Sequence, residues 1–192
     1  MEQYRFEVQK IEVNGATILA FVNGMGVFKK KAIEILSSHG INDIQPDEWY
    51  PAQSYLNAFK VISEKLGDKV VRQMGKNIPK SAKWPSGIKD IESALASIDI
   101  AYHINHRKNG KPLFDPDTGK IEEGIGHYRF EKIDDHSAKI ICDSPYPCDF
   151  DMGIIEAVAN KFRPQGKTVK ITHEENACRK RGDKTCTYII TW

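Results

Sequence analysis

A turn-rich segment in the middle of the chain separates two stretches with different hydrophobic periods. It runs from Asn109 to Gly126 and contains Asn-Gly-Lys-Pro-Leu-Phe-Asp-Pro-Asp-Thr-Gly, so we expect a loop or the tip of a long hairpin there. Before it, apolar residues recur at three- and four-residue steps, as on amphipathic helices; after it, they alternate, as on strands with one buried face. This order predicts an α+β fold, with a helical N-terminal half packed on a mainly antiparallel sheet.

The helical half is expected to span residues 27–106, after an N-terminal hairpin over residues 1–24. That hairpin is predicted from two apolar runs joined by Asn14-Gly15, a dipeptide typical of hairpin turns. Apolar spacing and glycine stops then predict four helices. They cover about 27–39, 55–66, 68–76 and 86–106.

The region 125–192 is expected to hold the sheet, one helix and all the cysteines. Strands are predicted over 128–133 and 138–142, a helix over 151–162, and a final pair of strands over 168–174 and 185–192. Because side chains alternate along a strand, Cys186, Tyr188 and Ile190 should share one apolar face. Asp149 and Asp151 are interpreted as helix-capping residues, and Arg179-Lys180-Arg181 as a solvated basic run.

Composition narrows the class of protein. The 192 residues are enough for a single domain with one sizeable core. Lys plus Arg number 28 against 26 for Asp plus Glu, which gives no reason to expect a nucleic-acid surface. No secretory signal and no apolar run long enough for a bilayer is seen, so we expect a cytoplasmic protein without a membrane partner. Its four cysteines should then be reduced thiols rather than a disulfide framework.

The cysteines are the clearest chemical signal. Cys178 and Cys186 flank a glycine turn that would bring their side chains together, and Cys148 precedes the predicted helix. Thiolates are preferred zinc ligands, and Glu175 or, second to it, His173 would complete a set of four. Strict alternation points Glu175 away from Cys178, so the chain must bend near Asn176. Buried inert or redox-active thiols and a Cys178–Cys186 disulfide remain alternatives.

The pattern Glu-x-x-Cys-x7-Cys with Gly-Asp in the turn, after a helix and a Val-Ile strand, resembles the vinyl-4-reductase-type small-molecule-binding domain. That family includes sensor modules of aromatic-responsive bacterial activators and is akin to Golgi transport-particle subunits and haem nitric-oxide sensors. The match spans about 142–192. The resemblance implies a transport-particle-subunit-like single domain with a structural zinc site, although Cys142 competes with Cys148 as the upstream ligand. The implied ligands are Cys148, Glu175, Cys178 and Cys186.

The same resemblance implies a buried pocket for a small apolar or aromatic molecule in the helical half. Its counterparts here are Trp84, Tyr102, His103 and His106. His103 and His106 are also interpretable as solvent-facing residues that complement a helix dipole. Haem is not expected, because no Cys-x-x-Cys-His attachment motif occurs.

These observations favour a noncatalytic small-molecule-binding sensory domain, acting as a homodimer or through a signalling partner. Three alternatives stay open: a zinc- or thiol-dependent enzyme, a haem-binding gas sensor, and an assembly subunit without a ligand. A bound water on the metal would favour the enzyme. A filled core without a pocket would favour the assembly subunit.

Overall fold

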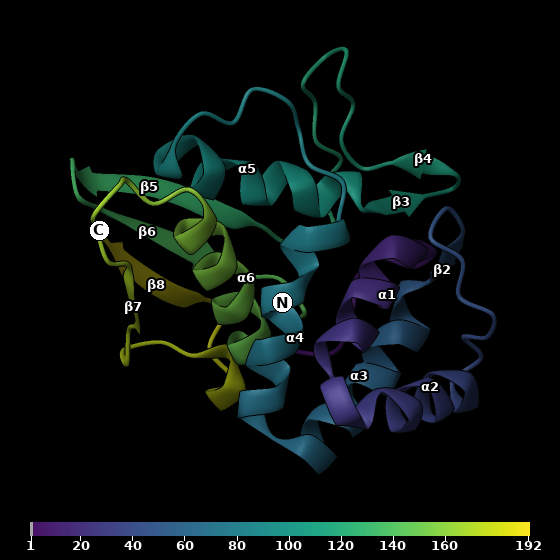
Figure 1. The fold of residues 1–192 in the computed structure, drawn as a ribbon. Helices are drawn as coiled ribbons and strands as arrows, with labels where there is room; N and C mark the ends of the chain where they lie inside the picture. The colour runs from purple at the N-terminus through teal and green to yellow at the C-terminus, as the bar shows by residue number, and fades with distance from the viewer. Residues whose placement is uncertain (1) are drawn as a thin grey trace.

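The computed structural model describes residues 2–192 and has the α+β architecture expected from the sequence (Figure 1). Six α-helices and two short 3-10 helices are found in this part of the chain. They are α1 (Gly15–Gly24), η1 (Gly26–Phe28), α2 (Lys29–Ser38), α3 (Ala52–Leu66), α4 (Asp68–Ser81), α5 (Ile91–Ile104), α6 (Cys148–Lys161) and η2 (Arg179–Arg181).

Two antiparallel four-stranded sheets accompany the helices, in the orders β2-β1-β3-β4 and β5-β6-β8-β7. The first sheet is small and belongs to the helical half. The strands are β1 (Ile11–Asn14), β2 (Trp49–Pro51), β3 (His106–Lys108), β4 (Lys111–Pro112), β5 (Tyr128–Asp134), β6 (Ser137–Cys142), β7 (Lys170–His173) and β8 (Cys186–Thr191).

The expected N-terminal hairpin over residues 1–24 is wrong. Ile11–Asn14 is a strand, but the following apolar run forms α1. A hairpin turn of the Asn-Gly type needs a positive φ at Asn14, whereas Asn14 has φ −67° and its side chain caps the helix by accepting from Ala16 N at 2.9 Å. Asn-Gly therefore begins a buried helix here.

The other predicted elements form, with shifted ends. The helix expected over 68–76 continues to Ser81, and the one expected from Ser86 to His106 is α5, which is shorter. Asp90 decides the start of α5, because its carboxylate accepts from Ser93 N at 2.8 Å in a capping box. Two residues of the turn-rich segment form β4, which pairs with β3 directly before the segment.

The hydrophobic core lies between the larger sheet and the helices. Figure 1 shows α6 on one face of the sheet, with α4 beside it and α1 to α3 beyond. On β8 the residues Cys186, Tyr188 and Ile190 are buried on one face, as the alternation predicted. Among residues 2–192, no helix is both long and apolar enough to cross a bilayer.

Candidate metal centre and ligand cavity

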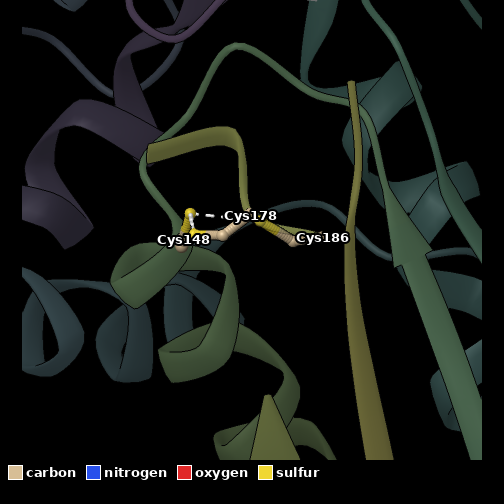
Figure 2. A group of neighbouring side chains, drawn as sticks. All are labelled: Cys148, Cys178 and Cys186. Atoms are coloured by element: carbon tan, nitrogen blue, oxygen red, sulfur yellow. Dashed lines mark hydrogen bonds between the residues drawn. The ribbon is translucent and has the colours of Figure 1, made fainter. Parts of the chain in front are cut away.

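Three of the four cysteines converge where α6 and β8 begin (Figure 2). Cys148 is the first residue of α6, Cys178 directly precedes η2, and Cys186 is the first residue of β8. The turn between the last two closes through Gly182, whose φ of 90° is a left-handed conformation that glycine adopts without strain. Asp183 fixes the same turn, because its carboxylate accepts from Cys178 N at 2.8 Å.

The sulfur positions suit a thiolate metal site. The Cys148 Sγ atom lies 3.1 Å from that of Cys186 and 3.6 Å from that of Cys178. All three side chains are buried and none forms a disulfide. A tetrahedral zinc ion with Zn–S bonds of about 2.3 Å would separate its sulfurs by about 3.8 Å. The cluster would therefore need only a small outward shift to hold such an ion.

The cluster already favours a thiolate. The hydrogen bond between the Cys148 and Cys186 sulfurs raises the pKa of Cys148 and lowers the pKa of Cys186 to about 4. Burial raises the pKa of Cys186, whereas the nearby Arg179 lowers it further. The Gln3 side chain donates to Cys148 Sγ at 3.0 Å, and Arg179 N donates to Cys186 Sγ at 3.3 Å. Such donors stabilise negative charge on metal-binding sulfur.

Glu175 and Cys142 lie outside this group. Glu175 is exposed on the loop after β7, and its backbone carbonyl accepts from the Arg181 side chain. Cys142 is buried on β6 opposite Cys186, but its sulfur is not among the three gathered atoms found in residues 2–192. His173, the second choice for a fourth ligand, stacks on Tyr188 with 4.9 Å between ring centroids.

Arg179 and Asp151 were both misinterpreted from the sequence. Arg179 is buried rather than solvated, and its guanidinium pairs with the buried carboxylate of Asp151. Tyr128 Oη also donates to Asp151, at 2.6 Å. Burial raises the pKa of Asp151 to about 7, an effect that Arg179 and Tyr128 partly offset. This ion pair holds η2 against α6 beside the cysteines.

An apolar cavity of about 40 Å³ lies between α1, α4, α5 and α6. Three of the four expected pocket residues, Trp84, Tyr102 and His106, line it. The sequence did not indicate the contributions of Tyr146, Phe150 and Tyr128, because no motif marks an aromatic residue that tertiary packing brings to a cavity. Within residues 2–192, the buried Trp84 Nε1 has no hydrogen-bond partner.

Hydrogen bonds at both ring nitrogens hold His106 in the cavity wall, and its imidazole is neutral. Its Nδ1 donates to the carbonyl of Tyr102 at 2.8 Å, and its Nε2 bonds to Tyr146 Oη at 2.9 Å. Burial lowers the pKa of His106 to about 4. The ring therefore positions Tyr102 and Tyr146. Because His106 is buried, its interpretation as a solvent-facing residue is wrong.

His103 is buried as well, but it does not line the cavity. One nitrogen of His103, one of His127 and an oxygen of Asp99 lie within 4.8 Å of one another. Burial lowers the pKa of His103, whereas the hydrogen bond to Asp99 raises the pKa of His127 to about 9. No sequence pattern associates His127 with His103, because the two residues are far apart along the chain.

Comparisons with known proteins identify the fold. No protein-family model and no curated protein matches the sequence. Solved structures of H-NOX proteins do match. A triple mutant from S. oneidensis in the Fe(II) ligation state has a TM-score of 0.64 and 15% identity, over 93% of this chain and 95% of that one. The S. oneidensis protein in the Fe(II)NO state has a TM-score of 0.63 and 15% identity, over 92% of this chain and 97% of that one. A Cs H-NOX mutant with an unnatural amino acid has a TM-score of 0.61 and 18% identity, over 93% of this chain and 95% of that one.

The chain has the H-NOX fold.

The match covers nearly the whole of each H-NOX chain, so the helical half and the sheet both belong to the shared architecture. The part of the expected resemblance that these structures confirm is the fold shared with H-NOX proteins. Identities of 15–18% show no more than the fold, so the chemistry of this chain must be inferred from its own residues.

Proposed function

We propose that this H-NOX-like chain is a noncatalytic sensory domain that binds a small apolar or aromatic molecule. The molecule would occupy the cavity between α1, α4, α5 and α6. A structural zinc ion held by the cysteines would join the start of α6 to the start of β8. The observation that carries the proposal is that Trp84 lines this apolar cavity while its buried Nε1 has no hydrogen-bond partner within residues 2–192.

A buried donor without a partner is costly, and a ligand with one hydrogen-bond acceptor would satisfy it. Aromatic rings line the rest of the cavity, so the remainder of the ligand should be apolar and flat. The present 40 Å³ holds a few water-sized groups. A ligand the size of benzene would therefore require Tyr146 or Trp84 to move, and binding would change the packing of the helical half.

The zinc part of the proposal is supported by the three gathered sulfurs. We propose Glu175 as the fourth ligand: a bend of the loop near Asn176 would turn its exposed side chain toward Cys178. The four ligands would then be those implied by the vinyl-4-reductase-type resemblance, namely Cys148, Glu175, Cys178 and Cys186. Zinc there would join α6 to the final strand and leave no open position for chemistry.

Haem, the group carried by H-NOX proteins, does not fit the residues of this cavity as they are arranged. Both nitrogens of His106 are engaged, so neither is free for iron. His103 has a free nitrogen but lies outside the cavity lining. A macrocycle would also have to displace the aromatic layer that contains Tyr146 and Phe150, which pack at 5.4 Å between ring centroids.

An enzyme is the second candidate, because one observation favours it. The gathered group in residues 2–192 has three cysteines, with Glu175 exposed, and catalytic zinc sites keep three protein ligands and an open position. A metal-bound water in the loaded protein would support this candidate over the structural site.

As a sensor, the chain would act in the cytoplasm, where reduced thiols persist, and would signal through a homodimer surface or a partner protein. Neither an enzyme nor an assembly subunit requires a ligand-dependent change in the helical half. A shift in the oligomeric state on ligand binding is therefore the behaviour specific to the sensor.

The test combines elemental analysis with native mass spectrometry on protein purified without chelators. We expect at least one zinc per chain and a copurifying small molecule, or binding of phenol when it is added. The Trp84→Phe variant removes the Nε1 donor together with part of the indole ring, so it should lose more affinity for phenol than for toluene. Protein that is metal-free and binds neither probe would refute the proposal.

A further inference from the structure

A second cluster of metal-ligating groups lies between α5 and the start of β5. Asp99 and His103 occupy successive turns of α5, and His127 directly precedes β5. The Asp99 carboxylate joins the two elements, because Oδ1 accepts from Tyr128 N at 2.8 Å and Oδ2 lies 3.0 Å from His127 Nδ1.

The separations are close to those between ligands on one small cation. Zinc bound to nitrogen and oxygen at about 2.0–2.1 Å places its ligand atoms about 3.4 Å apart in a tetrahedron. Here one nitrogen of His103, one nitrogen of His127 and one Asp99 oxygen all lie within 4.8 Å of one another, and His127 Nδ1 lies 3.0 Å from Asp99 Oδ2. The His103 and His127 ring centroids are 5.1 Å apart. Glu123, on the exposed loop, lies 2.8 Å from His127 Nε2.

His103 supplies an independent sign that a ligand is missing. Its Nδ1 donates to the Asp99 carbonyl at 2.8 Å, so its Nε2 carries a lone pair. The side chain is fully buried, and Nε2 has no partner among residues 2–192. A neutral imidazole with a free nitrogen in a buried position is the form in which histidine binds transition metals.

We propose that Asp99, His103 and His127 form a second metal site for a divalent transition cation of the zinc class. This inference is independent of the cysteine site and of the sensory function. Imidazole and carboxylate ligands suit Zn²⁺ and Co²⁺ and differ from the soft thiolate set. The ion would tie α5 to β5 beside Tyr102 and Tyr128, both of which line the cavity.

A proton explains part of the same geometry. Protonated His127 between Asp99 and Glu123 would make two ion pairs without any metal. It would leave His103 Nε2 unpartnered, whereas a cation would employ both rings. The two explanations therefore differ in whether His103 and His127 respond together to added metal.

Titration of the full chain with Co²⁺ separates the two sites in one experiment. Cobalt bound to thiolates gives intense charge-transfer absorption in the near ultraviolet, whereas cobalt on nitrogen and oxygen ligands gives only weak visible bands. We expect the wild type to show both signatures. The His127→Lys variant keeps a positive charge beside Asp99 and Glu123 but cannot coordinate while protonated, so it should lose only the weak bands.

Changes in groups that support a metal ligand cost roughly 10- to 100-fold in affinity, so replacing a ligand should weaken Co²⁺ binding by at least about 100-fold. The control is His136→Asn, at an exposed position in the turn between β5 and β6, which should bind both ions as the wild type does. A wild type without the weak bands, or a His127→Lys variant that keeps them, would overturn the proposal. Loss of the thiolate signature alone would count against the cysteine site instead.

A second measurement needs no variant. In the ¹⁵N-histidine-labelled wild type, Zn²⁺ should shift the imidazole signals of His103 and His127 together and leave His136 unchanged. Unchanged signals for His103 and His127 at saturating Zn²⁺ would contradict the site even if the substituted protein does not fold.

Discussion

Gly75 of α4 and Gly153 of α6 face each other where the two helices cross. A Cβ atom placed on Gly75 would lie 3.1 Å from Gly153 Cα and 2.2 Å from the Phe150 carbonyl oxygen. One placed on Gly153 would lie 2.2 Å from the Arg72 carbonyl oxygen. The backbones are therefore in direct contact, and this contact places Cys148 and the cavity wall relative to the helical half.

We expect Gly153→Ala to lower the free energy of unfolding by about 1–3 kcal/mol, or more if the helices cannot separate, because the added methyl meets backbone rather than a mobile side chain. Urea denaturation provides the measurement. Lys69→Ala, an exposed change in α4, is the matched control and should stay within about 0.5 kcal/mol of the wild type. Equal midpoints for the two variants would show that the helix crossing is not tight.

Replacing one clustered cysteine should abolish metal binding at the cysteine site. Cys178→Ser removes a proposed ligand, so we expect the zinc content to fall and the melting temperature of the purified protein to drop toward that of chelator-treated wild type. Cys142→Ala alters a buried thiol outside the cluster and should keep its zinc. Loss of metal in both variants would mean either that Cys142 is the upstream ligand or that both substitutions disrupt the fold.

The Tyr146 hydroxyl should matter for stability out of proportion to its size. Tyr146→Phe removes the partner of His106 Nε2 and leaves a buried polar atom unsatisfied, which should cost about 1–3 kcal/mol. Tyr50→Phe is a suitable comparison, because its hydroxyl bonds only at an exposed loop. Equal stabilities of the two variants, measured by thermal denaturation, would argue that water replaces the lost partner.

Acid should selectively weaken the α4–α6 contact through Glu156. Burial raises the pKa of Glu156, but hydrogen bonds from Lys76 and Arg72 outweigh it and bring the pKa below the ordinary value of 4.5. A carboxylate with a lowered folded-state pKa stabilises the fold above about 4.5 and loses that contribution as the pH falls through the folded value.

Glu156→Gln should therefore be less stable than the wild type at neutral pH, by up to about 1 kcal/mol, because the ion pairs are only partly buried. The difference should shrink as the pH falls from about 4.5 through the lowered folded-state pKa of Glu156. Denaturation of both proteins across this range tests the sign. A difference that stays constant with pH would mean that Glu156 acts through packing rather than charge.

Local patterns in the sequence determined the α+β class, most helices, and the positions of the last four strands. Alternation placed Cys186 on a buried face of β8, and the cysteine spacing indicated that Cys178 would lie near it. These features depend on periodicity and turn chemistry, which act over a few residues and are therefore visible in the sequence. Asn14-Gly15 marks the limit of such patterns, because the same dipeptide serves as a hairpin turn or a helix cap.

Only the tertiary structure decided which distant groups meet. Arg179 looked like part of a solvated basic run until η2 placed it against Asp151, and His103 was grouped with His106 until packing placed it beside His127 instead. A charge or an imidazole acquires its role from the partner that folding brings within a few ångströms. That partner lies many residues away, so no local spacing encodes it.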